Sequence, residues 1–334
     1  MGSDQPEEVG SVLDVRGPEP APRGCDEEDE PQGVRVQPEP HAVLGQVRTV
    51  ELFPRGDHRD GRPADRCARS GVLLHCPLDD GGQWNMFVNV VRKHGVVPQA
   101  VMPESESSSN TGRMNAVLRR KLREGARTLR DLRAGGAPME AARAAKTEIL
   151  RVIYRILCIH LGTPPDSFDW QWNDKDKAFH RDGRMTPLQF AEKYITLPLD
   201  DYVCLVHDPR ESSAFNQTYT VRFLGNVVGG EIVKYLNVEI DVMKDVARRT
   251  IMDGEAVWFG CDVGKMMRRD LGLWDRHLFD FETLYDTSFT LDKAERLTHH
   301  ETLMTHAMLF TGVDVEDDTA RRWRVENSWG EENG

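Results

Sequence analysis

The sequence predicts an α+β protein in which a helical half precedes a sheet-rich half. Apolar residues recur at helical spacing up to about residue 200, and β-branched and aromatic runs bounded by Gly, Asp and Pro follow. The first 70 residues differ from both halves, because they hold nine of the 18 prolines and an excess of acidic side chains. Such a segment buries too little apolar surface to offset its ordering entropy. We therefore predict a disordered acidic extension over 1–70, a helical lobe over 71–200 and a sheet-rich lobe over 201–334.

Four helices are expected in the first half. The segments 84–92 and 113–133 place their apolar residues three and four positions apart. A third helix, over 138–162, has a proline at its start and a glycine at its end. A fourth, over 186–194, opens with a Thr cap followed by Pro. The Ser- and Glu-rich segment 104–111 is predicted to be a loop.

Five strands and one helix are expected in the second half. The helix runs from Val238 to Met252 and is closed by Gly254. The strands are β-branched or aromatic runs that lie between turn residues. They cover residues 202–207, 218–224, 256–261, 305–313 and 322–327.

Composition and charge exclude several classes of protein. No stretch approaches the roughly 20 apolar residues that a membrane-spanning helix needs. The net charge of −12 opposes binding to nucleic acid, because phosphate contacts need surplus cations. The six cysteines form no C-x-x-C pair, and the start of the chain has no secretory signal. We therefore expect a cytoplasmic protein with reduced thiols, no metal site, no cofactor and no membrane partner.

One segment departs from this acidic average. Arg113–Arg133 carries eight basic and two acidic side chains. A basic helix can lie along phosphates, but a solvated face or a surface between subunits explains the same pattern. We favour the second explanation and expect no nucleic-acid partner.

The end of the chain carries the strongest chemical signal. Asn327 follows a predicted strand, and His306 stands 21 residues earlier at the start of another. If these strands are antiparallel neighbours, the start of one lies beside the end of the other, so the two side chains meet. An Asn carbonyl that accepts from one ring N–H fixes the tautomer and directs the other nitrogen to a nucleophile, and the indole of Trp329 is placed to cover that bond. Spacing alone leaves an alternative open: an interior histidine and an asparagine in a turn.

Several longer motifs occur in order between Leu73 and Gly334. They are DGGQW (80–84), PES (103–105), DKD (174–176), NVVGG (226–230), DGEAVWFGCDVG (253–264), ETLMTHAM (301–308) and NSWG (327–330). Together they resemble the papain-like cysteine peptidases, and most of all the branch of bleomycin hydrolases and aminopeptidases C.

The resemblance implies a papain-like two-lobed fold, a helical lobe plus a sheet lobe, with the active site in the cleft between them. It implies that His306 is the general base and that Asn327 orients it. The implied reaction is thiol-dependent hydrolysis of N-terminal residues from peptides, of bleomycin-type amides and of homocysteine thiolactone. The implied assembly is a homo-oligomer, which is a hexamer in the family.

Two departures from the family pattern accompany the match. The family's nucleophile lies upstream of GGQW in a Gly-x-Cys-Trp motif preceded by an oxyanion Gln, and this sequence has neither. Of its upstream cysteines, Cys25 lies in an acidic run that opposes thiolate formation, and Cys76 is too close to GGQW to head the missing helix. Cys67 has no aromatic residue and no apolar helix behind it, so we do not assign it as the nucleophile.

The second departure is that the chain stops at Gly334, where the family continues to a C-terminal arm that restricts cleavage to the aminopeptidase type. We therefore expect a variant or fragment, incomplete at both ends and inactive as given, and an erroneous gene model would have the same appearance. The alternative from a different class is a non-catalytic binding or assembly subunit that keeps the fold without the nucleophile.

Overall fold

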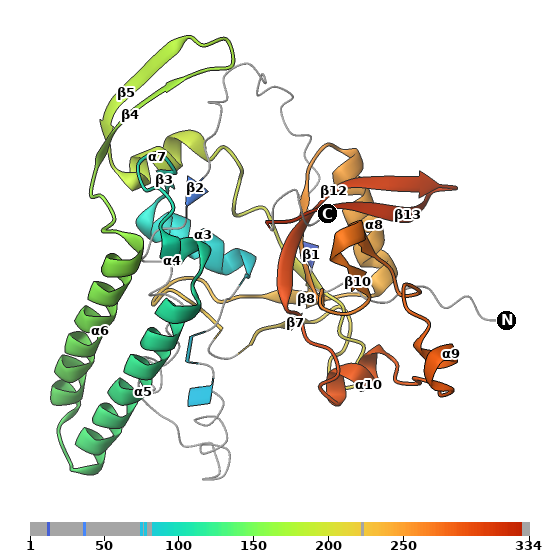
Figure 1. Cartoon of the computed structure of the whole chain (residues 1–334), viewed down its shortest axis with the longest axis horizontal. Coiled ribbons are helices and arrows are strands. Elements are labelled where there is room, and N and C mark those ends of the chain that lie inside the picture. Colours follow the sequence, from blue (N-terminus) through green and yellow to red (C-terminus); the bar gives the residue numbers. More distant parts are fainter. Residues whose placement is uncertain are drawn as a thin grey trace. The chain divides into compact units, whose positions relative to one another are not determined.

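The computed structural model describes residues 82–221 and 224–328, residues 74, 75, 77 and 78, and the backbone of two short strands, β1 (Val12–Leu13) and β2 (Val36–Gln37). These residues form two compact units, a helical unit and a sheet unit (Figure 1). The predicted extension over 1–70 lies outside the described residues apart from β1 and β2, and it stays a prediction.

The division between the units falls at residues 197 and 198. Residues 224–233, which the sequence assigned to the sheet-rich lobe, lie with the helices, and β1 lies with the sheet.

The helical unit is built from five helices and two small ribbons of strands in the described part of the chain. The helices are α3 (Trp84–His94), α4 (Glu106–Ser109), α5 (Gly112–Ala134), α6 (Met139–Leu161) and α7 (Pro187–Tyr194). The ribbons pair β2 with β3 (Val97–Pro98), and β4 (Phe168–Asn173) with β5 (Phe179–Met185).

Helices α5 and α6 lie side by side (Figure 1). Leu118 and Leu122 of α5, which are four residues apart and share one face, pack with the fully buried Ile153 and Leu157 of α6. The apolar stripes found in the sequence therefore form a common core, as helical spacing predicts.

Helix α4 corrects one prediction. The segment 104–111 was expected to be a loop, yet its serines form a capping box: Ser108 N–H donates to Ser105 Oγ over 3.1 Å, and Ser105 N–H donates to Ser108 Oγ over 2.9 Å. These side chains satisfy the free N–H groups at the start of a helical turn. A sequence typical of loops therefore forms a short helix.

The β4–β5 hairpin was not foreseen from the sequence. Its strands carry a stack of rings, in which Trp172 lies 5.7 Å from Trp170 and 5.3 Å from His180 between ring centroids. The indole N–H of Trp170 donates to Tyr194 Oη over 3.0 Å, and Tyr194 O–H donates to Asp182 Oδ2 over 2.6 Å. Rings on one face of the hairpin therefore join it to α7.

The sheet unit contains a seven-stranded sheet of order β13-β12-β9-β1-β6-β8-β7. Its strands besides β1 are β6 (Cys204–Val206), β7 (Thr218–Tyr219), β8 (Tyr235–Asn237), β9 (Val257–Cys261), β12 (His306–Glu316) and β13 (Thr319–Glu326). The other elements are α8 (Ile240–Met252), β10 (Met267–Arg268), a 3₁₀ turn (Arg269–Leu271), β11 (Leu273–Trp274), α9 (Phe281–Tyr285) and α10 (Lys293–Thr298). No helix in the described ranges is long and apolar enough to cross a membrane.

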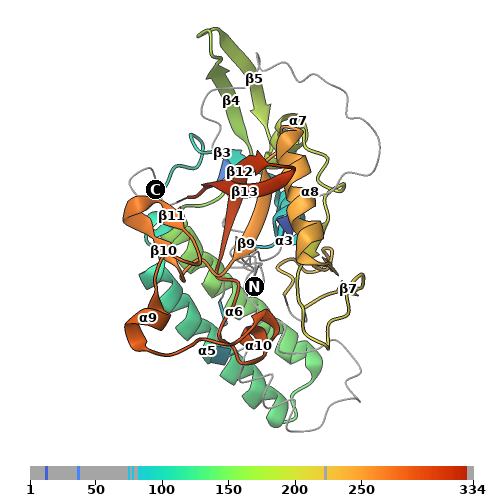
Figure 2. The ribbon, with the colours of Figure 1, turned by 90° about the vertical axis from the view of Figure 1, so that its right-hand side faces the viewer.

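Helix α8 covers one face of the strands β9 and β12 (Figure 2). Met243 of α8 is fully buried against Phe259 of β9 and Phe310 of β12, whose rings stack with centroids 3.6 Å apart. This core fixes the two strands that lead to the candidate site.

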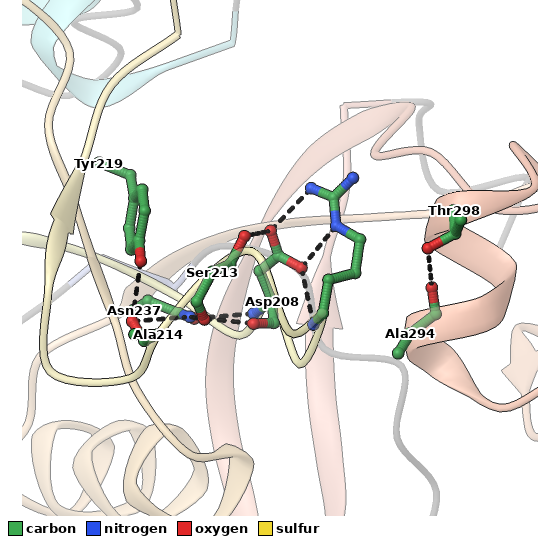
Figure 3. A network of polar contacts seen from close by, with 8 residues as sticks. Asp208, Ser213, Ala214, Tyr219, Asn237, Ala294 and Thr298 are labelled. Carbon is green, nitrogen blue, oxygen red and sulfur yellow. Dashed lines mark hydrogen bonds and ion pairs between the residues drawn. The ribbon is translucent and has the colours of Figure 1, made fainter.

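A buried amide shapes the loop between β6 and β7 (Figure 3). The Asn237 side chain, which is fully buried, donates to the carbonyl oxygens of Asp208 and Ser213 and accepts from Asp208 N–H over 2.8 Å. The Asp208 carboxylate accepts from Arg210 and from Ser213 Oγ. All polar groups of Asn237 are therefore satisfied inside the core, as burial requires.

Candidate active site

His306 and Asn327 meet at the end of the β12–β13 pair. His306 is the first residue of β12, and Asn327 directly follows β13. The strands are antiparallel with Leu309 opposite Glu326, so residue 327 lies beside the start of β12. His306 Nε2 is 2.9 Å from Asn327 Oδ1, and both side chains are half-buried. The predicted juxtaposition of the two side chains is confirmed.

The backbone of Ser328 fixes which atom of the Asn327 amide faces the ring. Ser328 N–H donates to Asn327 Oδ1 over 2.8 Å, and a backbone N–H can only donate, so that atom is the oxygen. An amide oxygen accepts from His306, and Nε2 therefore carries a hydrogen. In the neutral ring the basic lone pair is then on Nδ1.

The other end of the Asn327 amide is held by Met308. Asn327 Nδ2 donates to Met308 Sδ over 3.4 Å, and Met308 is buried two residues after His306 on the same face of β12. Sequence reasoning named His306 and Asn327 but missed Met308 and Ser328, although the alternation of side chains along a strand was a usable signal for Met308.

Gly260 leaves room for a methionine side chain beside this site. It lies opposite Ala307 in the β9–β12 pair, and a Cβ at Gly260 would lie 2.4 Å from Met304 Sδ. The missing side chain therefore makes room for the Met304 side chain, two residues before His306.

The described cysteines do not supply an obvious nucleophile. Cys204 and Cys261 are buried in the sheet unit, and burial raises the pKa of the Cys204 thiol to about 12, which opposes the thiolate. Cys158 is half-buried on α6 in the helical unit. Cys25, Cys67 and Cys76 lie outside the described residues, as does Trp329.

Neither the site nor its surroundings form a metal centre in the described part of the chain. His299 and His300 follow α10, and no group of three His, Cys, Asp or Glu side chains that could hold a metal ion occurs among the described residues.

Comparison with known proteins decides the family. Residues 62–334 match the peptidase C1-like family. The chain belongs to this family.

A solved structure agrees with this fold. The crystal structure of PepW from Lactobacillus rhamnosis has a TM-score of 0.80 at 40% sequence identity, over 91% of this chain and 69% of that one. This confirms the papain-like α+β fold and the resemblance that the motifs indicated.

Curated relatives in the peptidase C1-like family are longer than this chain. Bleomycin hydrolase of Homo sapiens is 44% identical over 291 residues, which is 85% of this chain and 63% of the relative. Aminopeptidase C of Streptococcus thermophilus is 44% identical over 263 residues, which is 78% of this chain and 59% of the relative. The chain therefore spans less than two thirds of either relative, and the catalytic roles of His306 and Asn327 stay a prediction.

Proposed function

We propose that this chain carries the histidine and asparagine of a cysteine aminopeptidase site. The observation that supports this most directly is the hydrogen bond from His306 Nε2 to Asn327 Oδ1, because Ser328 fixes the carbonyl orientation that the reaction needs. A histidine held in one tautomer by a third group is the general pattern of nucleophile activation.

In this proposal His306 acts through Nδ1. The neutral ring takes the proton of a thiol, and the thiolate attacks the amide carbon of the substrate. The imidazolium then gives the proton to the leaving amine, and water hydrolyses the acyl-enzyme. Asn327 stabilises the imidazolium and keeps Nδ1 available in both steps.

We propose peptides with a free N-terminus and related amides as the substrate class. The names of the relatives, bleomycin hydrolase and aminopeptidase C, support this class. Homocysteine thiolactone belongs to the same proposal, because a thiolate attacks its acyl carbon by the same chemistry.

Because the sequence contains no Gly-x-Cys-Trp motif and Cys67 is not assigned as the nucleophile, we expect this chain to turn over no substrate. The test is a chimera in which the residues ahead of Leu73 are replaced by the corresponding Gln and Gly-x-Cys-Trp segment of a full-length relative.

With aminoacyl fluorogenic amides, the chimera should gain turnover over the background of the unmodified chain. A folded chimera without activity would favour the non-catalytic subunit. Turnover by the unmodified chain that Cys67→Ser abolishes would show that Cys67 is the nucleophile.

A further inference from the structure

The segment before His306 is tied to the segment after β9 by two threonines. Thr305 N–H donates to the Cys261 carbonyl over 2.9 Å, and Thr305 Oγ1 accepts from Val263 N–H over 3.2 Å. Thr302 Oγ1 donates to Asp262 Oδ2 over 2.9 Å. We name Thr302 and Thr305, with their partners Asp262 and Val263, the threonine clamp.

An ion pair closes the outer end of this clamp. Lys265 Nζ is 2.8 Å from Glu301 Oε1 and 3.6 Å from Asp262 Oδ2, and it also donates to the Glu301 carbonyl. The Asp262 side chain is only 11% exposed, so it needs both the hydroxyl of Thr302 and the nearby cation. The hydrogen bond from Lys265 holds the pKa of Glu301 below its ordinary value.

The position of the clamp links it to the histidine. His306 follows Thr305 directly, so the backbone from which the ring projects is fixed by the contacts of Thr305. Asn327 makes no contact with the clamp among the described hydrogen bonds, and is held by β13, by Ser328 and by Met308 of β12. The pairing of β12 with β9, in which His306 lies opposite Cys261, also holds this backbone. The clamp adds the side-chain contacts that set how the chain enters β12.

We propose that Thr302 and Thr305 are positioning residues, which hold His306 Nε2 against Asn327 Oδ1 through the threonine clamp. The proposal rests on the proposed function for its catalytic meaning, but its geometric claim is measurable without turnover. A merely structural role would lower the stability of the protein and leave this hydrogen bond intact.

The experiment is NMR of the full chain labelled with ¹⁵N-histidine, in which the His306 Nε2–H signal is identified by its loss in His306→Gln. The measured quantity is the exchange rate of this proton with water. Thr302→Val and Thr305→Val remove one hydroxyl each at nearly constant volume, and Thr302→Ser and Thr305→Ser keep it. Thr298→Val is the matched control, because the Thr298 hydroxyl donates to the Ala294 carbonyl within α10.

We expect exchange to accelerate about three- to tenfold in each valine variant, which corresponds to loss of about one hydrogen bond. The serine variants should match the unmodified chain, and Thr298→Val should not change the rate. Unchanged exchange in folded valine variants, or equal acceleration in Thr298→Val, would overturn the proposal.

A second variant covers the case in which the valine proteins do not fold. Glu301→Gln neutralises a carboxylate that is 57% exposed and weakens the ion pair that closes the outer end of the clamp. Faster exchange in this variant supports the clamp, and an unchanged rate counts against it. If the unmodified chain shows no protected Nε2–H signal, the His306–Asn327 geometry itself fails, and the proposed function fails with it. If the signal is protected and its exchange rate is the same in every clamp variant, only the proposal of the clamp fails.

Discussion

His207 shows how burial decides the chemistry of a single side chain. Its ring is buried, and Lys293 Nζ lies 2.9 Å from Nδ1. Burial, with the Lys293 cation next in importance, lowers the pKa of His207 to about 4. The ring is therefore neutral near pH 7, so Nδ1 accepts a hydrogen bond from the ammonium group and ties α10 to the end of β6.

This shifted pKa predicts a pH dependence of stability. Above pH 6.5 the ring is neutral in the folded and in the unfolded chain, so its titration does not lower the free energy of unfolding. Between pH 6.5 and about 4 the unfolded chain binds more protons, so the free energy of unfolding falls as the pH falls. The slope from this residue approaches about 1.4 kcal/mol per pH unit.

The measurement is urea unfolding of the unmodified chain and of His207→Gln from pH 4 to pH 7. Glutamine keeps an acceptor for Lys293 and does not titrate, so the difference between the two proteins should shrink or reverse towards pH 4. A difference that is constant with pH would contradict the assignment of a neutral buried ring.

The site residues show what a sequence can and cannot give at this scale. The pairing of His306 with Asn327 followed from two strand boundaries. The tautomer did not, because it depends on the backbone N–H of Ser328, whose direction no residue type encodes. Met308 is placed by strand alternation, but its contact with the Asn327 amide depends on a side-chain conformation.

Among the elements, α3 ends at a glycine that no other residue can replace easily. Gly95 has a φ of 75°, and a Cβ there would lie 2.2 Å from backbone atoms of Pro187 at the start of α7. Gly136 has a similar φ of 79°, but nothing lies within 4 Å of its Cβ position. Alanine substitutions at these two glycines therefore distinguish the cost of backbone strain from the cost of a steric clash.

We expect Gly95→Ala to lower the free energy of unfolding by about 3 kcal/mol or more, because it combines strain with overpacking against backbone. Gly136→Ala should cost about 1 kcal/mol, from strain alone. Chemical unfolding of both variants checks this, and equal losses would show that α7 moves to accept the new methyl group.

Helix α5 should not give the chain affinity for nucleic acid, despite its eight basic residues. Arg120 pairs with Glu124 and Arg127 lies 4.0 Å from Asp131, while Arg123 donates to the backbone of Leu74 and His75. The chain's net charge of −12 also opposes approach to phosphate.

Filter binding at roughly 150 mM salt should detect no tight complex with duplex or single-stranded DNA. The matched variant combines Arg120→Glu, Arg127→Glu and Arg130→Glu and leaves the structural Arg123 unchanged. Tight, salt-sensitive binding that this variant abolishes would contradict the expectation.

Sequence patterns predicted the long helices and missed some of the smaller elements. Long helices such as α5 and α6 were predicted within a few residues, because their apolar spacing repeats over several turns. The β4–β5 hairpin was missed, since its stability comes from ring stacking across strands and from Tyr194 of α7. The three-residue strand β8 was also missed, whereas β6, which is equally short, lies within the longer predicted run 202–207.

For the whole molecule, membership of the peptidase C1-like family agrees with the observed fold. The reaction stays a prediction. The central claim is that His306 and Asn327 form the base and the orienting group of a thiol peptidase. Its most direct test is the turnover number of the chimera that carries the Gly-x-Cys-Trp segment, measured for His306→Ala, for Asn327→Ala and for Arg322→Ala, an exposed residue of β13.

We expect His306→Ala to lower kcat by about 10⁴-fold or more, because the nucleophile loses its base. Asn327→Ala should lower it by about 10- to 100-fold, the effect of one lost hydrogen bond to a charged ring, and Arg322→Ala should leave it unchanged. A chimera whose His306→Ala variant keeps its turnover would contradict the account.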